Sequence, residues 1–192
     1  GNGLLQNVVA NDAWTNITTA PVDVVYTIAP VATTTGCVGD AFTLTITINP
    51  EPVGIAGTAE SCSDVQFTVV LDNNDVSNSQ AGTTYAWAAN DNTNVTGENS
   101  SSGNIVSTIN NISATNQLVT YVITPTGANG CVGNTFNYVA TIKPETVVAN
   151  QTATVCSDAS IGVTLANDVN TPAVDYYNLT LISPATGLIA NG

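Results

Sequence analysis

The residues of this 192-residue chain best suited to covalent chemistry are its four cysteines, Cys37, Cys62, Cys131 and Cys156. They belong to two blocks that each occur twice: Gly-Cys-Val-Gly around Cys37 and Cys131, and Cys-Ser-Asp at Cys62 and Cys156. A zinc site is disfavoured, because there is no Cys-x-x-Cys pair and no histidine. Four cysteines in a repeated pattern favour disulfides in an extracellular setting.

Acidic residues are the second group that could do chemistry. The chain has 14 acidic residues and one basic residue, Lys143, for a net charge of −13. Paired carboxylates can catalyse glycoside hydrolysis, and Asp72, Asp75 and Asp91 are the candidates. All three lie in Asn-rich segments, where aspartate is typical of turns. Because histidine and arginine are absent as well, the sequence predicts that the chain is not an enzyme.

Calcium binding is a more plausible role for these carboxylates than catalysis. Asp72, Asp75 and Asp168 supply the hard oxygen ligands that Ca²⁺ prefers, and they could line a site between domains. No EF-hand spacing is present, so ordinary turn chemistry is the competing and favoured interpretation. The sequence indicates no other cofactor.

Three aromatic residues could form a platform for stacking a sugar: Tyr85, Trp87 and Trp14. Aromatic side chains on sandwich strands pack in the core more often, and we expect this of at least one of Tyr85 and Trp87. Asn-x-Ser/Thr triplets are also present, but in a chain this rich in these residues we expect them by chance. They begin at Asn16, Asn94, Asn99, Asn111, Asn150 and Asn178.

The composition excludes several classes of partner. Nucleic acids and anionic membranes are bound through Lys and Arg, and this chain has one such residue. No apolar run is long enough to span a bilayer, so we expect no membrane insertion. No basic and apolar leader opens the sequence, which starts in the middle of a pattern. We therefore expect an interior piece of a longer protein.

The elements that position these residues are predicted to be short β-strands. Residues 42–48 alternate strictly between apolar and polar side chains, as a half-buried strand does. Runs rich in Val, Ile, Thr, Tyr and Phe predict further strands at 66–71, 84–87, 104–109, 118–125 and 136–142. Clusters at 72–75 and 98–103 predict turns. With no amphipathic helix, the pattern predicts an all-β fold of tandem Ig-like antiparallel sandwiches.

An internal repeat of 94 residues, the spacing from Cys37 to Cys131 and from Cys62 to Cys156, defines the folding unit. Residues 36–75 and 130–169 are identical at 18 of 40 positions. Proline-containing junctions follow two of the predicted strands, at 49–52 and 143–145, and proline suits a stiff connection. Three parts are expected: the C-terminal part of a repeat (1–50), a complete repeat (51–144) and the N-terminal part of the next (145–192). The two partial repeats complement each other, so the chain could tile end to end.

Several motifs together resemble the PKD-like, immunoglobulin-like repeats of giant Bacteroidota cell-surface proteins. They are the Thr-Ala-Thr-Val-Cys-Ser-Asp string at 152–158, the strand at 118–125 followed by Gly-Cys-Val-Gly, and Tyr85-x-Trp87. The resemblance implies β-sandwiches without catalytic residues, in adhesins and gliding-associated proteins exported by the type IX system. Around Tyr176 the second copy departs from the motif, because no tryptophan follows.

The cysteine pairing remains open between alternatives. A Cys37–Cys62 disulfide would bridge the first proline junction, whereas Cys62–Cys131 would lie within the complete repeat. We favour Cys62–Cys131, because the first and last strands of such sandwiches often lie side by side. Cys37 and Cys156 would then pair with adjacent repeats or copies. The entropy of loop closure, roughly 4 kcal/mol for the longer loop and about 3.5 kcal/mol for the shorter, does not separate these alternatives.

The expected function is that of a structural repeat unit in a large extracellular bacterial surface protein, forming the shaft of an adhesin or filament. The expected partners are neighbouring copies of the repeat, end to end and also lateral, since the chain has almost no lysine to protect its strand edges. The alternative is a carbohydrate- or calcium-binding sandwich module.

Overall fold

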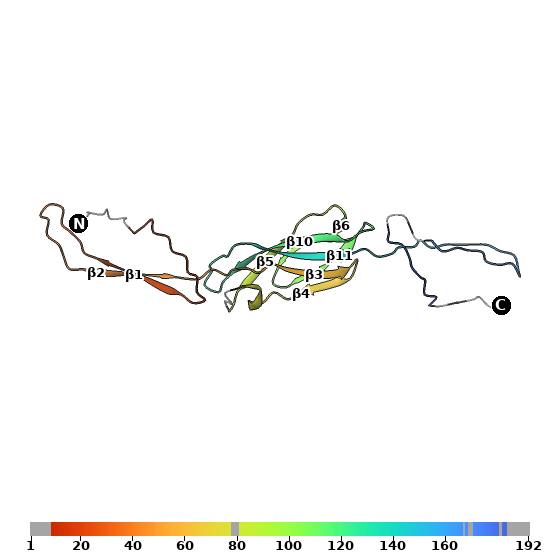
Figure 1. Ribbon diagram of the computed structural model, residues 1–192, viewed down its shortest axis with the longest axis horizontal. Helices are drawn as coiled ribbons and strands as arrows, with labels where there is room; N and C mark the ends of the chain where they lie inside the picture. The colour runs from red at the N-terminus through yellow and green to blue at the C-terminus, as the bar shows by residue number, and fades with distance from the viewer. Residues whose placement is uncertain (1–8, 78–80, 167, 169–170, 181, 184–192) are drawn as a thin grey trace.

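The computed structural model describes residues 9–77, 81–166, 168, 171–180 and 182–183. Three parts follow one another along the long axis of the molecule (Figure 1). They are a hairpin of β1 (Val22–Ile28) and β2 (Phe42–Ile48), a central β-sandwich, and a stretch from residue 144 onward in which the described residues form no strand. The hairpin and the C-terminal stretch lie at opposite ends of the sandwich.

The central sandwich is built on one five-stranded sheet with the order β3-β11-β10-β5-β7. Its strands are β3 (Gly57–Cys62), β11 (Phe136–Lys143), β10 (Gln117–Thr126), β5 (Thr84–Ala89) and β7 (Ser100–Ser102). The pairs within it are antiparallel except β3–β11, which is parallel. The prediction of an all-β, mainly antiparallel sandwich is confirmed.

The second layer consists of two short antiparallel pairs and a turn. β4 (Gln66–Val69) pairs with β8 (Ile105–Thr108), and β6 (Val95–Thr96) pairs with β9 (Asn110–Asn111). A 3₁₀ turn, η1 (Asn73–Asp75), follows β4. This layer covers one face of the five-stranded sheet, and the apolar side chains between them form the core.

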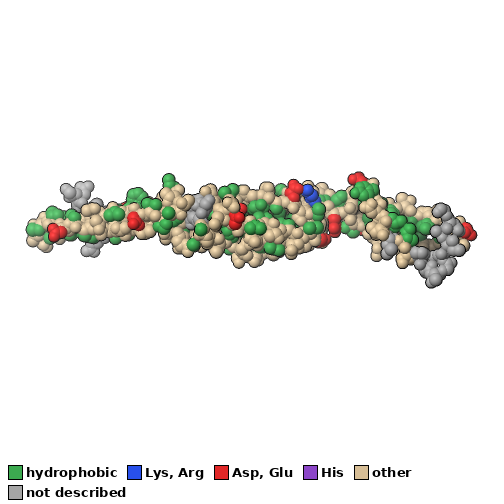
Figure 2. All heavy atoms as spheres, turned by 90° about the horizontal axis from the view of Figure 1, so that it is seen from below, with side chains coloured by type: hydrophobic (Ala, Val, Ile, Leu, Met, Phe, Trp, Pro, Cys, Tyr) green, Lys and Arg blue, Asp and Glu red, His purple; other side chains and the backbone are tan. Residues whose placement is uncertain are grey.

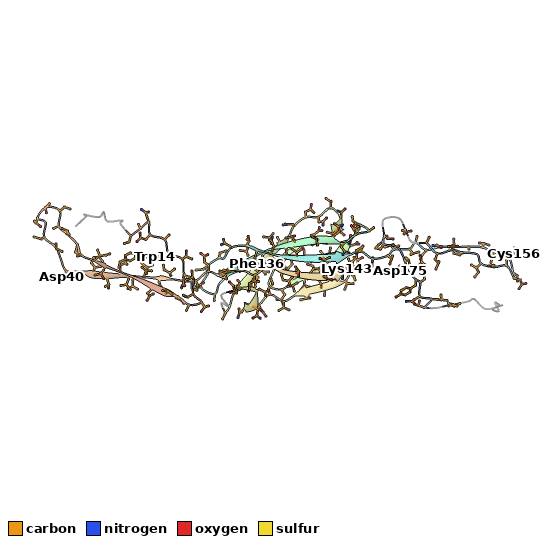
Figure 3. The ribbon with its side chains drawn as sticks, in the orientation of Figure 1. Trp14, Asp40, Phe136, Lys143, Cys156 and Asp175 are labelled. Carbon is orange, nitrogen blue, oxygen red and sulfur yellow. The ribbon has the colours of Figure 1, made fainter. Side chains whose placement is uncertain are left out.

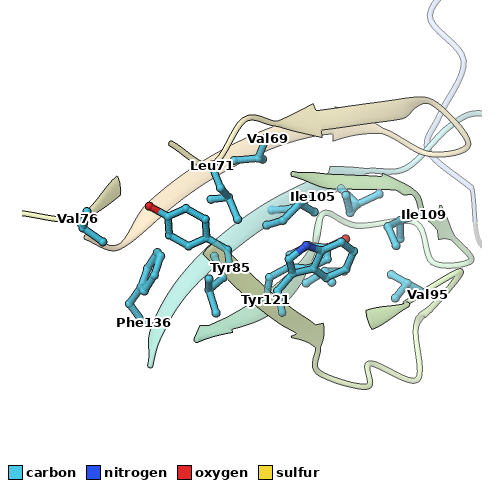
Figure 4. Close-up of a cluster of buried hydrophobic side chains, with 14 residues drawn as sticks. Val69, Leu71, Val76, Tyr85, Val95, Ile105, Ile109, Tyr121 and Phe136 are labelled. Atoms are coloured by element: carbon cyan, nitrogen blue, oxygen red, sulfur yellow. The ribbon is translucent and has the colours of Figure 1, made fainter. Parts of the chain in front are cut away.

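The core is a continuous cluster of apolar side chains in which aromatic rings meet edge to face (Figure 4). Tyr121 lies at its centre and is fully buried. Its ring contacts Trp87 and Phe67 with centroid separations of 5.5 and 6.2 Å, and Tyr85 meets Phe136 at 6.5 Å. Edge-to-face aromatic pairs add to the free energy gained from burying the rings.

The predicted strands agree with the structure where the sequence alternates or is rich in β-branched residues. β2 has the predicted bounds, and each of the other five predicted strands overlaps β4, β5, β8, β10 or β11. β1, β3, β6 and β9 were not predicted. The 98–103 cluster, predicted as a turn, contains β7, because the edge of the sheet beside β5 supplies backbone partners for the polar residues Ser100–Ser102.

Charged groups are sparse on the surface of the molecule (Figure 2). Lys143 forms an ion pair with Glu60 across the β3–β11 pair, with 2.6 Å between Nζ and Oε2. Glu60 raises the pKa of Lys143. Both side chains are exposed, so this pair contributes little to stability. Within the described residues, no helix is long and apolar enough to cross a bilayer.

Candidate functional site

The carboxylates of Asp72 and Asp75 stabilise the turn at η1. Asp72 accepts a hydrogen bond from the Asn74 backbone N–H at 2.7 Å, and Asp75 accepts one from the Asp72 N–H at 2.7 Å. The two side chains therefore form a reciprocal capping box. Burial, and then the charges of Asp75 and Asp72, raise the pKa of Tyr85, whose hydroxyl donates to the Asp72 carbonyl oxygen at 2.5 Å.

Asp168, the third calcium candidate, lies at the other end of the sandwich. Its backbone N–H donates to the carbonyl of Val147, beyond the end of β11, whereas Asp75 pairs through its backbone carbonyl with Ile55, before β3. The structure therefore does not bring the three acids together. Among the described residues, no cluster of three or more His, Cys, Asp or Glu side chains could hold a metal ion.

The Cys62–Cys131 disulfide is not formed in the structure, where all four thiols are free. The first and last strands, β3 and β11, lie side by side as expected. They run parallel, so Cys62 pairs with Lys143 at the end of β11. Cys131 precedes the start of β11, so the two cysteines are separated by the length of that strand, about 23 Å. A disulfide needs Cα atoms within about 7 Å. The structure therefore does not bring Cys62 and Cys131 within the distance that the favoured pairing needs.

The aromatic candidates divide between the core and the surface. Tyr85 and Trp87 are both buried, which confirms the core prediction and removes them from any sugar platform. Trp14 is 56% exposed; its Nε1 donates to the Tyr26 hydroxyl at 2.9 Å, which in turn donates to Asp12 at 2.8 Å. An exposed tryptophan in a fixed orientation is a candidate contact residue.

The β1–β2 hairpin reproduces the β10–β11 pair of the sandwich. Val24 pairs with Ile46 as Val119 pairs with Ala140, and the same correspondence holds along the register. The connecting loops agree as well. Pro30 accepts from the Gly39 N–H at 2.8 Å, and Pro125 accepts from the Gly133 N–H at 2.9 Å. The hairpin therefore has the form of the last two strands of a sandwich.

The correspondence extends to a side-chain motif before the hairpin. Asn16 donates through Nδ2 to Ala20 and Ile48 carbonyls at 2.8 and 2.7 Å, and its Oδ1 accepts from the Thr18 N–H and hydroxyl. Asn111 makes the same four contacts. Its partners are Thr115, Ile142 and, for both Oδ1 bonds, Ser113. The Asn-Ile-Ser/Thr triplets at these two positions therefore have a structural role and are not chance occurrences. This role was not predicted from the sequence.

One face of the hairpin is apolar, and among the described residues no second layer covers it as β4 and β8 cover its counterpart. We call it the open hairpin face: Val22, Val24, Tyr26, Ile28, Phe42, Leu44, Ile46 and Ile48. Phe42 is 53% exposed, whereas its counterpart Phe136 is 8% exposed in the core. Within the described residues, β2 pairs only with β1, whereas β11 has β3 on its other edge. An apolar face beside a free strand edge is suited to binding protein.

The C-terminal stretch carries the complementary part of the pattern. Asp158 has a positive φ of 64°, as Asp64 has at 59°, and the Ala159 N–H donates to Cys156 as Val65 donates to Cys62. The turn between β3 and β4 is thus repeated after Cys156. We call residues 148–165 the tail clasp, because its two arms line an apolar hollow. The lining includes Val148, Ala153, Val155, Ile161, Val163 and Leu165.

Comparison with protein families shows to which family this fold belongs. The model of a PKD-like domain matches residues 5–52 and 59–146. The chain belongs to the PKD-like domain family. The second match begins within β3 and extends past β11, and the first contains the hairpin, so the PKD-like pattern covers most of the chain. No curated protein matches the chain.

PKD-like domains are non-catalytic modules, and they are typical of extracellular and surface proteins. The candidate surfaces of this PKD-like chain are the apolar residues exposed on the hairpin and the apolar hollow lined by residues 148–165. Figure 3 shows their separation: Asp40 and Trp14 lie in the part that contains the hairpin, and Cys156 lies at the far end of the molecule.

Proposed function

We infer that this chain is a structural repeat unit of a large extracellular bacterial surface protein, of the kind found in giant Bacteroidota proteins exported by the type IX system. Its role is to form the shaft of an adhesin or filament. Residues 51–144 are one complete repeat, 1–50 are the end of the preceding repeat, and 145–192 are the beginning of the next.

One observation carries this proposal: the same hydrogen-bonded hairpin occurs twice along one axis. Asn16 and Asn111 anchor the two copies, and the parts follow one another in line (Figure 1). Proline residues stiffen the connections, with Pro50 and Pro52 before the sandwich and Pro144 after it. Repetition of one unit along an axis extends a molecule in one dimension.

The surface composition supports an extracellular role. With a single basic residue, the chain offers almost no sites to proteases that cleave after Lys or Arg. The alternative, a carbohydrate- or calcium-binding module, is supported less well. Trp87 lies in the core, and Asp72 and Asp168 lie at opposite ends of the sandwich.

The proposal is tested by measuring length and location. Small-angle X-ray scattering of chains carrying one, two and three fused copies should show a maximum dimension that rises by a constant increment per copy. A dimension that stays nearly constant would mean that the repeats fold back on one another, and the shaft role would be wrong. Antibodies against the central sandwich should label intact cells of the source bacterium. Labelling only after lysis would contradict the surface location.

A further inference from the structure

We propose that disulfides join consecutive repeats of this protein across each proline junction. Each disulfide links the Cys-Ser-Asp cysteine of one repeat to the Gly-Cys-Val-Gly cysteine of the repeat that follows it. Cys62 and Cys131 are therefore not partners of each other, but belong to opposite junctions of the central sandwich. The proposal rests on the shaft function proposed above, in which the repeats are parts of one longer chain, and it names the bond that fixes neighbouring repeats to each other.

Cys62 lies at the end of the sandwich that leads into the next repeat. It is the last residue of β3 and pairs with Lys143, the last residue of β11. The buried Ser63 donates its backbone N–H to the Lys143 carbonyl at 2.8 Å. Pro144 comes next in the chain. The Cys-Ser-Asp turn is thus hydrogen-bonded to the residue that precedes the proline of the second junction.

Cys131 lies at the other end of the sandwich, beside the junction with the preceding repeat. Asn129 connects the two, because its Oδ1 accepts from the Cys131 N–H at 3.3 Å and its Nδ2 donates to the Pro50 carbonyl at 3.4 Å. Gly133 packs so closely against the Pro52 carbonyl that an added Cβ would collide with it. The loop that carries Cys131 is therefore fixed to the first proline junction.

The internal repeat combines these two observations at a single junction. A shift of 94 residues carries Pro50 onto Pro144. Because the Pro50 carbonyl accepts from the loop of Cys131, we expect the Pro144 carbonyl to accept from the corresponding loop of the next repeat. The preceding carbonyl, that of Lys143, already accepts from the turn of Cys62. One cysteine segment from each repeat is therefore held by consecutive residues of the same junction.

A disulfide within one repeat does not fit this arrangement. β3 and β11 are parallel, so Cys62 and Cys131 are separated by the eight residues of β11. A disulfide needs Cα atoms within about 7 Å. The same rule assigns the other two cysteines. Cys37 pairs with the Cys-Ser-Asp cysteine of the repeat before its own, and Cys156 pairs with the Gly-Cys-Val-Gly cysteine of the repeat after its own.

The thiols of a junction are accessible to an oxidant. Cys62 is exposed, and Cys131 is partly exposed. Each bond forms by exchange with an external disulfide: the two cysteine thiols lose two protons and two electrons, and the external disulfide is reduced to two thiols. Disulfides form and persist outside the cell, which is the location proposed for this protein.

The bond changes how one repeat moves relative to the next. The backbone crosses each junction once, through Pro50 or Pro144. A disulfide beside the proline is a second covalent connection between the same two repeats, so it limits bending and rotation there. We therefore expect an oxidised array to be straighter than a reduced one.

The pairing is tested in two copies of the chain fused end to end, in which the end of the first copy and the start of the second form one repeat. Oxidised glutathione is added at about 1 μM protein, where links within a molecule are favoured over links between molecules. Mapping of non-reduced peptides should find Cys37–Cys62 and Cys131–Cys156, because these pairs come from adjacent repeats. Cys62–Cys131 and Cys37–Cys156 pairs, which lie within repeats, would overturn the proposal, and so would thiols that stay unpaired.

Substitutions in one copy assign each bond to a junction. Cys62→Ser in the first copy should abolish the Cys37–Cys62 pair and leave Cys131–Cys156 intact. The same substitution in the second copy is the matched control and should leave both pairs, because its partner would lie in a third copy. A single unfused copy should keep four thiols that react with N-ethylmaleimide. Disulfides within that single copy would contradict the assignment.

The protein extracted from cells, with its thiols blocked by N-ethylmaleimide, gives a second test that does not depend on fusion. Each disulfide should join a Cys-Ser-Asp peptide to a Gly-Cys-Val-Gly peptide, and the Cys62 peptide should not be joined to that of Cys131. Blocked thiols at all these positions would overturn the proposal. The shaft function is judged separately, since scattering of the fused chains under reducing conditions measures their length without any disulfide.

Discussion

Asn16 makes the same backbone contacts as Asn111. Asn16 Nδ2 donates to the Ile48 carbonyl at 2.7 Å, and Asn111 Nδ2 donates to the Ile142 carbonyl at 2.9 Å. In each case the amide ties the segment before a hairpin to the end of its second strand. The two asparagines differ in their surroundings, because Asn111 is buried within the sandwich and Asn16 is only half-buried.

This difference predicts unequal effects of the same substitution. Asn111→Ala should lower the free energy of unfolding of the central sandwich by about 2–3 kcal/mol, because it leaves buried backbone groups without partners. Asn16→Ala should leave the unfolding of the central sandwich unchanged. Urea titrations followed by Trp87 fluorescence in a Trp14→Phe background measure this. Equal losses in both variants would mean that the hairpin and the sandwich unfold as one unit.

Two buried tyrosines should respond differently to loss of the hydroxyl. Tyr85 donates to the Asp72 carbonyl, so Tyr85→Phe should cost about 1 kcal/mol. The Tyr121 hydroxyl is buried without a hydrogen-bond partner in the described part of the chain, and the nearby Ser107 hydroxyl already donates to Asn99. Tyr121→Phe should therefore be neutral or slightly stabilising. A large loss in thermal or urea stability for Tyr121→Phe would show that its hydroxyl is bonded.

The same tyrosines predict how stability depends on pH. Burial raises the pKa of both Tyr85 and Tyr121 above the usual value near 10. The folded state therefore holds these protons more tightly than the unfolded state does. Their contribution to stability is present below about pH 10 and lost as the pH rises further. Urea midpoints measured between pH 8 and 11 should fall at the alkaline end, and the Tyr85→Phe/Tyr121→Phe double variant should show a smaller fall.

Gly57 and Tyr138 should be energetically coupled. Gly57→Ala should destabilise the sandwich by about 1–3 kcal/mol, because the new Cβ would lie 2.1 Å from the tyrosine ring. Combining it with Tyr138→Leu should recover part of that loss, since leucine lacks the ring atoms that the new Cβ would meet. A double-mutant cycle on unfolding free energies measures the coupling. Strictly additive effects would contradict the steric argument.

Calcium should have no effect on the η1 turn. Asp72→Ala should lower stability by about 1 kcal/mol through loss of the cap, and equally with calcium or with chelator present. Thermal unfolding of the wild type and the variant in both conditions checks this. A rise in the wild-type midpoint with calcium that Asp72→Ala abolishes would assign a metal site to the turn.

Much of the sandwich could be predicted from the sequence, because local patterns alone determine which faces are apolar. The strict alternation at 42–48 predicted β2 with its observed bounds, and β-branched runs predicted strands that overlap β10 and β11. β3 was missed because Gly57–Cys62 is mostly small and polar, and it forms a strand only where β11 offers a free edge. β7 was missed for the same reason, because the polar residues Ser100–Ser102 form a strand only where they pair with β5.

The sequence by itself determined the repeat, the all-β class and the resemblance to PKD-like domains, since each depends on residue order and composition. Only the tertiary structure decided the direction of the β3–β11 pair, and with it the positions of the cysteines. Parallel and antiparallel pairing suit the same alternating residues, yet they place Cys62 at opposite ends of the sheet. The direction is decided by how the chain crosses between the two layers, a long-range contact that no local pattern records.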